Sequence, residues 1–277
     1  GGSMGLALRE LNESKNATMT FSRIFGYDTN PLHSQQALSL GLVDECVEFD
    51  AIEQCDVVFL ATPLEAIIET LEKFEHIKND CTIIDLGGAK QKIIASIPPK
   101  IRKNFVAAHP MSGTENFGPN AAIKGLFYNK IVIIADEEHS GKSQLAIAKQ
   151  IFISIGMRII KMSAKAHDKH TAYISHLPHI ISFALANTVL AQEEPQNILA
   201  LIGGGFKDMS RIAKSSPIMW RDVFVQNKDN LLESIESFGK EMLYAKTLVK
   251  EEKWEELVEW MGRANSLHNF ISGNKID

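Results

Sequence analysis

The sequence of 277 residues lacks most features of secreted, membrane-spanning or nucleic-acid-binding proteins. Its three cysteines, Cys46, Cys55 and Cys81, are scattered and lack metal-ligand spacing, which argues against a disulfide framework and favours a reducing, cytoplasmic compartment. The longest apolar stretch, 177–191, is shorter than the ~20 residues of a membrane span. The net charge of −5 argues against nucleic acid as the main partner. We therefore expect a cytoplasmic protein whose partners include neither nucleic acid nor membrane.

The chain divides into two regions of different pattern. Because 45% of its residues are hydrophobic, it can bury a substantial core, and its length favours two domains. Residues 1–162 alternate β-branched apolar segments with helical ones, which predicts a parallel sheet with helices on its faces. The expected strands are 21–28, 56–62, 82–88, 104–110, 130–136 and 157–162. Residues 163–277 repeat apolar residues at helical spacing and predict an all-helical domain.

The helical region has more apolar helix faces than its few helices can bury against one another within one chain. Met242, Trp254, Trp260 and Phe270 belong to these faces. They could fill a core within one chain, but we favour an interface between two copies of the chain.

The first residues, GGSMGLAL, indicate the end of a dinucleotide-binding turn, where small residues lead into a helix. Free N–H groups and the helix dipole favour a pyrophosphate at such a position. We predict that Gly1, Gly2, Ser3 and Met4 contact the cofactor, although GGS could equally be a linker. If Gly1 is the third glycine of G-x-G-x-x-G, a first strand and two glycines come before it. We therefore expect the native chain to have residues before Gly1.

Three further segments support a Rossmann-type nucleotide site. Asp28 ends RIFGYD, about 20 residues past the turn, where an acid binds the ribose 2′-hydroxyl of NAD; capping the next helix is its alternative role. Thr62 and Pro63, which end DVVFLATP, are expected near the nicotinamide ribose. Gly87 and Gly88 end the next strand and either let the backbone approach the cofactor or form a tight turn. Together these features predict NAD as the cofactor.

The segment HPMSGTE contains the candidate catalytic base. His109 ends the apolar run NFVAA, and the proline and glycine after it stop the strand and turn the chain. Ligands bind at the carboxyl ends of parallel strands, so His109 is placed for proton transfer near neutral pH. A histidine that only hydrogen-bonds the turn is the alternative. Ser112, Thr114 and Glu115 lie on the same turn.

Two clusters in the helical region are candidates for substrate binding. SHLPH places His176 and His179 on one helical face, with a proline expected to kink the helix. They could be core histidines, and no third ligand at suitable spacing supports a metal site. In GGGFKDMSRIAK, Lys207 and Arg211 lie four residues apart and could hold a dianionic substrate. A solvated charged face is the alternative.

Together, GGSMGLAL, CDVVFLATP, DLGGAK, HPMSGTE, SHLPH and GGGFKDMSRIAKSSPIMWRD resemble the prephenate dehydrogenase family, related to the 6-phosphogluconate dehydrogenase group. The resemblance covers nearly the whole chain. It implies an N-terminal Rossmann-type NAD domain and a C-terminal all-helical dimerisation domain. It also implies NAD-dependent oxidative decarboxylation of prephenate to 4-hydroxyphenylpyruvate in tyrosine biosynthesis, by a homodimer. Whether arogenate is also a substrate stays open.

The resemblance implies a role for each candidate residue. His109 accepts the proton of the ring hydroxyl while hydride leaves the same carbon for nicotinamide. His179 and Arg211 hold the carboxylates of the substrate, with support from Lys207, and Asp28 selects NAD. The residues implied to line the mouth of the site or lie near it are Thr114, Glu115 and His176.

One position departs from the family pattern. Gly88 stands where many members have a serine that bonds the catalytic histidine and the substrate hydroxyl. Our hypothesis is that Ser112 or a bound water replaces it. Two other functions stay open: a β-hydroxyacid dehydrogenase with Lys207 as its base, and a non-catalytic NAD-binding dimer, which Gly88 favours.

Overall fold

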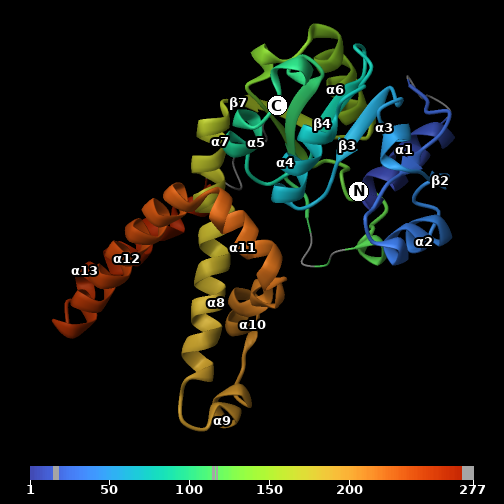
Figure 1. The fold of residues 1–277 in the computed structure, drawn as a ribbon. Coiled ribbons are helices and arrows are strands. Elements are labelled where there is room, and N and C mark those ends of the chain that lie inside the picture. Colours follow the sequence, from blue (N-terminus) through green and yellow to red (C-terminus); the bar gives the residue numbers. More distant parts are fainter. Residues whose placement is uncertain (15–18, 114–115, 117, 270–277) are drawn as a thin grey trace. The chain divides into compact units, whose positions relative to one another are not determined.

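The computed structural model describes residues 1–14, 19–113, 116 and 118–269. The chain packs as two compact units, Gly1–Lys228 and Asp229–Asp277. The second unit consists of most of α12 (Lys228–Lys250) together with α13 (Trp254–Asn265), and the first contains every other helix and strand (Figure 1).

The first unit is built on a five-stranded sheet in the order β3-β4-β5-β6-β7. Its strands are β3 (Val57–Leu60), β4 (Thr82–Asp85), β5 (Phe105–Pro110), β6 (Ile131–Ala135) and β7 (Arg158–Met162). β3, β4 and β5 are parallel to one another, as predicted, whereas β6 runs antiparallel to β5, and β7 is parallel to β6. The described residues between β5 and β6 form only a short 3-10 turn, η2 (Pro119–Ala121), and no crossover helix. Without such a crossover the chain returns in the opposite direction.

The helices of the first unit are α1 (Gly2–Glu13), α2 (Pro31–Ser39), α3 (Phe49–Ile52), α4 (Leu64–Lys73), α5 (Gln91–Ala95), α6 (Lys142–Ser154), α7 (Ala164–Thr171), α8 (Leu177–Leu190), α9 (Pro195–Leu199), α10 (Gly204–Ser210) and α11 (Pro217–Gln226). The sheet ends with β7 at Met162 and the helical region begins with α7. A domain boundary at 162/163 stays a prediction.

A separate two-stranded parallel sheet, β1 (Phe25–Gly26) and β2 (Glu45–Cys46), is joined by α2. The strand expected over 21–28 is therefore much shorter than predicted. The side chain of Asn30 accepts a hydrogen bond from the Leu32 N–H, and Pro31 opens the helix. Because Asn30 caps α2, the alternative role of Asp28 as the helix cap is wrong.

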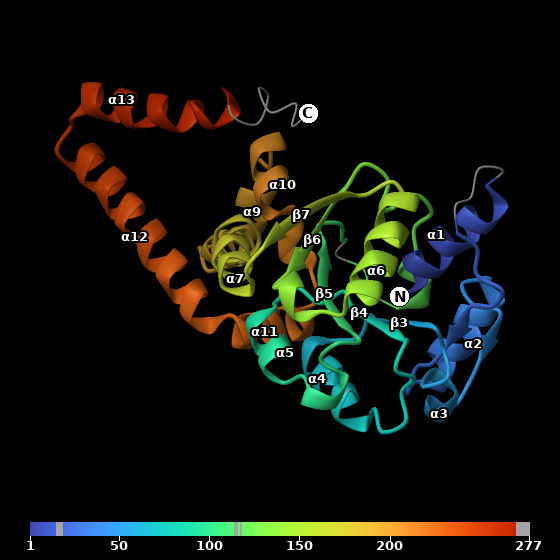
Figure 2. The ribbon, with the colours of Figure 1, turned by 90° about the horizontal axis from the view of Figure 1, so that it is seen from above.

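Two apolar clusters cover the two faces of the five-stranded sheet, because side chains alternate along each strand. On β5, Phe105 and Ala107 pack with the apolar residues of α4 and α5. Val106 and Ala108 face the other way and pack with the apolar residues of α1 and α6. In Figure 2, α4 and α6 lie on opposite sides of the sheet. By this alternation, His109 lies on the face covered by α4 and α5.

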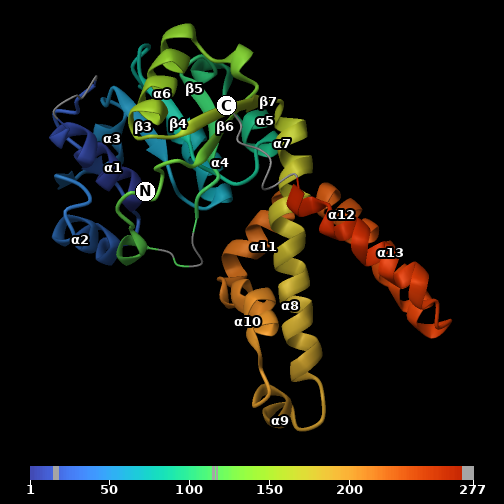
Figure 3. The ribbon, with the colours of Figure 1, turned by 180° about the vertical axis from the view of Figure 1, so that it is seen from behind.

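The helical region begins with α7 and α8, which follow one another without a loop. A π-helical turn, Ala172–His176, joins α7 to α8 (Figure 3). Pro178 follows in the first turn of α8, directly after the π turn. The kink expected at this proline stays a prediction. The described residues after β7 contain helices and no strand, as predicted. Among the helices described, none combines the length and apolar character needed to cross a membrane.

Gly5 tests the close packing of α1. A Cβ added at Gly5 would overlap the carbonyl oxygen of Leu42, a backbone atom that cannot turn aside. We expect Gly5→Ala to lower the free energy of unfolding by about 1–3 kcal/mol. Thermal unfolding should show a drop in Tm of roughly 2–4 °C per kcal/mol. Gly205→Ala is the matched control, because its Cβ meets nothing within 4 Å. Equal Tm values for the two variants would contradict this packing.

Candidate active site

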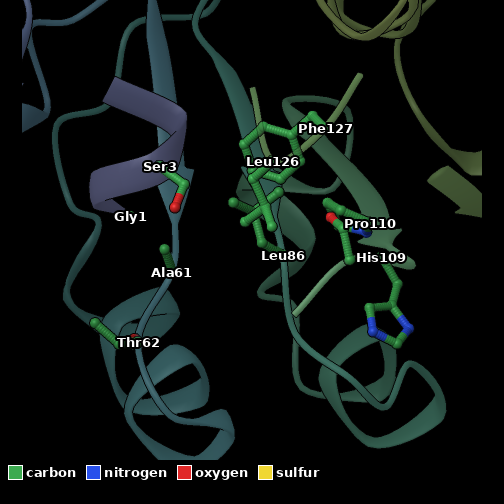
Figure 4. A pocket seen from close by; sticks show the side chains of 10 residues that line it. Gly1, Ser3, Ala61, Thr62, Leu86, His109, Pro110, Leu126 and Phe127 are labelled. Carbon is green, nitrogen blue, oxygen red and sulfur yellow. The ribbon is translucent and has the colours of Figure 1, made fainter. Parts of the chain in front are cut away.

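His109 stands at the carboxyl end of β5 and lines a pocket of about 240 Å³. The other lining residues are Gly1, Ser3, Ala61, Thr62, Leu86, Pro110, Ser112, Leu126 and Phe127. Figure 4 shows Ser3, Ala61 and Thr62 on one side and His109 on the other. The pocket lies at the edge of the sheet where the parallel strands β3, β4 and β5 end. This is the edge at which α/β sheets bind ligands.

The half-buried ring of His109 has a buried partner. Its Nδ1 lies 2.8 Å from Nε2 of His167, and the two rings meet edge to face. Nδ1 of His167 lies in turn 2.7 Å from Oδ1 of Asp168. His167 of α7 thus connects the carboxylate of Asp168 to the candidate base, His109.

The Asp168 carboxylate is held by the start of α5. Oδ1 accepts the Lys90 N–H at 2.7 Å, and Oδ2 accepts the Gln91 N–H at 2.8 Å. Burial raises the pKa of Asp168, but the hydrogen bonds from His167 and from these two N–H groups outweigh it and lower the pKa. Asp168 is therefore ionised at neutral pH.

A buried ion pair lies directly behind His109. The Lys90 ammonium contacts Asp85 and donates to the carbonyl of Ala108 at 2.7 Å. Asp85 in turn accepts the Ala108 N–H at 3.0 Å. Burial raises the pKa of Asp85 and lowers that of Lys90, while their mutual attraction opposes both shifts. Because Asp85 binds the N–H of Ala108 and Lys90 binds its carbonyl, the ion pair fixes the backbone of the residue before His109.

The surroundings of His109 favour the neutral imidazole. Burial, followed by the charges of His167, Lys90 and His176, lowers the pKa of His109 well below its ordinary value of 6.5. A neutral imidazole has one nitrogen able to accept a proton, which is what a general base needs at neutral pH.

Gly88 leaves room beside His109. A Cβ built at Gly88 would lie 3.9 Å from both Cε1 and Nε2 of His109, an ordinary contact distance. Ser112, the predicted substitute for the family serine, lines the same pocket. Its buried hydroxyl has no hydrogen-bond partner among the described residues. Whether Ser112 takes that role stays a prediction.

His176 and His179 share one aromatic partner, Trp220 of α11. The ring of His179 stacks on the indole with centroids 3.5 Å apart, and His176 meets it edge-on at 6.0 Å. Asn227 approaches Nδ1 of His176 at 3.2 Å and donates to the backbone oxygen of Asp168 at 2.7 Å. The SHLPH segment is therefore connected to the partners of His109.

The two histidines differ in exposure. His176 is 2% exposed, and burial lowers its pKa to about 4. His179 is half-buried and donates from Nδ1 to the Ser175 carbonyl at 2.9 Å, so its Nε2 is left for another partner. Burial lowers the pKa of His179, the hydrogen bond to Ser175 opposes this shift, and the charge of Arg211, on the turn packed against α8, adds to it.

Arg211 begins η5 (Arg211–Lys214), and Lys207 lies one turn earlier on α10. Both side chains are exposed. The structure thus brings Arg211 to His179 and places Lys207 on the neighbouring turn. The described residues contain no group of three or more histidines, cysteines or acids that could hold a metal ion.

The start of α1 has the properties of an anion site. Gly1 caps the helix without a side-chain hydrogen bond and lines the pocket with Ser3, whose hydroxyl accepts the Ile123 N–H at 3.0 Å. A Cβ at Gly2 would come within 2.9 Å of the side chains of Leu42 and Ala122. Small residues are therefore needed here, and the uncapped N–H groups fit the pyrophosphate of a dinucleotide.

Met4 differs from its neighbours in the same turn. Its side chain is 2% exposed and packs in the core with Ala7 and Leu8. Its N–H is bonded to the Gly1 carbonyl. Met4 thus shapes the helix, and its side chain does not line the pocket.

The remaining predicted cofactor residues occupy different environments. Asp28, partly exposed after β1, accepts the Asn30 N–H at 2.8 Å and lies 3.2 Å from Nδ1 of His33. Thr62 lines the pocket, and Pro63 is the exposed cap of α4.

Gly87 is a packing residue. A Cβ there would lie 2.7 Å from Leu64 and 3.0 Å from Ile93, so glycine lets α4 and α5 pack against the end of β4. Thr114 and Glu115, predicted to line the mouth of the site, lie outside the described residues.

Sequence reasoning missed the residues that surround His109. They are Asp85, Lys90, His167 and Asp168, with Leu126 and Phe127 in the pocket wall. Sequence reasoning also missed Trp220 and Asn227, which contact His176. One signal was present in DLGGAK, where an acid and a lysine flank the end of a fully buried strand. Another was the His-Asp pair on the helix that follows the last strand. Only the fold shows that these two signals meet.

The comparisons with known proteins agree over the whole chain. The family model for the nucleotide-binding domain of prephenate dehydrogenase matches residues 13–161, and that for its dimerization domain matches 163–263. Prephenate dehydrogenase of Bacillus subtilis is 31% identical over 281 residues, which cover 98% of this chain and 73% of the relative. Cyclohexadienyl dehydrogenase of Zymomonas mobilis is 30% identical over 239 residues, covering 84% and 82%.

Solved structures give the same result. The fold is similar to prephenate dehydrogenase from Aquifex aeolicus in complex with hydroxyphenyl propionate and NAD+, with a TM-score of 0.88 and 34% identity. The match covers 98% of this chain and 94% of that structure.

The lowered histidine pKa values predict a loss of stability in acid. In the unfolded chain these groups titrate near 6.5, so below that pH the unfolded state binds more protons than the folded state. The free energy of unfolding should fall as the pH drops from 6.5 toward 4. His176 contributes about 3 kcal/mol of this loss. Urea unfolding at about pH 7 and about pH 4.5 measures the difference.

His176→Gln is the comparison variant. It has no titrating group at this position, so its stability should fall less between the two pH values. A fall equal to that of the wild type would show that His176 is not the group responsible.

Proposed function

The chain belongs to the prephenate dehydrogenase family, and on that basis we propose that it oxidatively decarboxylates prephenate to 4-hydroxyphenylpyruvate with NAD in tyrosine biosynthesis. The observation that carries the proposal is the position of His109. It lies in the pocket reached by the first turn of α1, and its surroundings favour a neutral imidazole.

The chemistry needs one base and two anion sites. NAD, when bound, accepts the hydride from the carbon that bears the ring hydroxyl. His109 takes the hydroxyl proton, so that this carbon becomes a carbonyl. The C–C bond to the ring carboxylate then breaks, carbon dioxide leaves, and the electron pair completes an aromatic phenolate, whose oxygen takes up a proton to give the phenol. The lowered pKa of His109 leaves it unprotonated and ready for this transfer at neutral pH.

We assign the cofactor to the edge of the sheet near α1. The uncapped N–H groups at Gly1, Gly2 and Ser3 suit the pyrophosphate. Asp28 would accept hydrogen bonds from the ribose hydroxyls and repel the 2′-phosphate of NADP. Thr62 lines the pocket that leads from α1 to His109 and would lie near the nicotinamide ribose.

We assign the substrate carboxylates to His179 and Arg211, with support from Lys207. Arg211 influences His179 electrostatically, and Nε2 of His179 is free of the bond made by its Nδ1. This cationic group favours prephenate, which carries two carboxylates and no cation. Arogenate has an additional ammonium at the side-chain carbon, which these cations would repel, so we propose a preference for prephenate.

We also propose a homodimer formed through residues 163–277. In support, a prephenate dehydrogenase dimerization model matches 163–263. The helices of the second unit carry large exposed apolar side chains, namely Met242, Leu243, Tyr244, Trp254, Val258 and Met261. Exposed apolar surface of this kind is typical of subunit contacts.

For the compartment, we propose the reducing cytoplasm. Cys46, Cys55 and Cys81 are all free thiols in the structure. Scattered free cysteines are typical of proteins that work under reducing conditions.

Formation of NADH tests the function. We expect prephenate with NAD to give NADH absorbance, with lower kcat/KM for arogenate and for NADP. His109→Asn should lower kcat by roughly 10²–10⁴-fold because the proton acceptor is lost. His139→Asn changes an exposed histidine outside the pocket and should have no effect. Turnover of 3-hydroxyacids in place of prephenate, or near-native kcat in His109→Asn, would reject the proposal.

Arg211→Ala tests the substrate site. We expect KM for prephenate to rise about 10–100-fold while kcat changes little, because a charged contact common to ground and transition states is lost. Arg158→Ala, which removes an exposed arginine on β7, is the control. If instead the affinity for NAD falls and KM for prephenate does not change, the assignment of the two sites is reversed.

A further inference from the structure

The side chains of His167 and Asp168 are among the most deeply buried polar groups of the protein. Their exposed fractions are 0% and 1%. Burying an imidazole and a carboxylate is costly unless each is fully hydrogen-bonded. Both are bonded, and the chain of contacts ends at Nδ1 of His109.

The direction of each hydrogen bond follows from the chemistry of the groups. The Asp168 carboxylate can only accept, so His167 donates from Nδ1. A His167 ring that carries its one proton on Nδ1 has its lone pair on Nε2, which can accept the Nδ1–H of His109 at 2.8 Å. This leaves the lone pair of His109 on Nε2, the nitrogen beside the open space at Gly88.

We propose that His167 and Asp168 are positioning residues that fix the tautomer and orientation of His109, through the chain Asp168–His167–His109, so that Nε2 is its proton acceptor. The proposal rests on the function proposed above, in which His109 is the base. In that reaction the substrate hydroxyl proton moves to Nε2, and Nδ1–H stays bonded to His167. The positive charge that forms on His109 is stabilised by the Asp168 carboxylate through the His167 ring.

Lys90 fixes both ends of the hydrogen-bonded series Asp168–His167–His109. Its N–H donates to the Asp168 carboxylate, and its ammonium donates to the carbonyl of Ala108, the residue before His109. Asn227, which lies 59 residues further along the chain, fixes the backbone of α7 by donating to the carbonyl of Asp168. The three groups are therefore oriented before substrate binds.

Two positions test the proposal by kinetics. Asp168→Asn removes the charge and allows an amide to donate to Nδ1 of His167, which would reverse the tautomers of both rings. We expect kcat to fall roughly 10²–10⁴-fold, with the Kd of NAD and the KM of prephenate within about twofold of the wild type. His167→Gln keeps an oxygen that can accept from His109, so it should retain at least about tenfold more kcat than His167→Leu.

A spectroscopic readout separates orientation from structural support. Long-range ¹H–¹⁵N spectra of protein labelled with ¹⁵N-histidine report which ring nitrogen carries the proton. The spectrum of the His109→Asn variant lacks the signals of His109, and this identifies them in the wild-type spectrum. We expect the wild type to show His109 protonated at Nδ1 and Asp168→Asn to shift it toward protonation at Nε2.

Thr171→Val is the matched structural control. It removes the hydroxyl that bonds the same turn of α7 but leaves all three members of the chain, so kcat and the His109 tautomer should not change. The proposal is overturned if wild-type His109 carries its proton on Nε2. It is also overturned if Asp168→Asn and His167→Leu keep kcat within about threefold of the wild type. Failure of the wild type to oxidise prephenate would reject the proposed function instead, and the spectra would still decide the tautomer.

Discussion

The geometry of the site depends on the buried ion pair between Asp85 and Lys90. Two charges removed from water are costly, and their attraction compensates only when further hydrogen bonds satisfy both groups. Here Asp85 accepts the N–H of Ala108, and Lys90 donates to its carbonyl. Removing either partner would leave an uncompensated buried charge at the end of β5. The pair therefore couples the stability of this sheet edge to the position of His109.

The same pair connects the sheet to the helical region. Lys90 comes just before α5, and its N–H holds the carboxylate of Asp168 on α7. From Asp168, Asn227 reaches His176, which packs on Trp220 together with His179. A continuous set of contacts thus runs from the strand that carries His109 to the helix that carries His176 and His179. Shared buried groups therefore place the candidate base relative to the proposed substrate residues.

The electrostatic environment differs between His109 and Arg211. Near His109, burial and the Lys90 ammonium disfavour a further positive charge, which favours the neutral form of the imidazole. Near Arg211, exposed cations can attract an anionic substrate from solvent. The candidate base therefore lies in a more buried environment than the proposed substrate cations.

The sequence by itself determined the strands of the sheet, the helical second half and the position of His109 at a strand end. These depend on local patterns: runs of β-branched residues, helical periodicity, and the proline and glycine after His109. It did not predict the antiparallel β6, because the residues between β5 and β6 carry no sign of whether a crossover forms. Nor did it identify His167, Asp168 and Lys90 as neighbours of His109. Residues 58 positions apart in the chain meet at 2.8 Å only because α7 packs beside α5 at the edge of the sheet. Pairings of this kind belong to the tertiary structure, since local pattern has no information on which distant groups share a buried space.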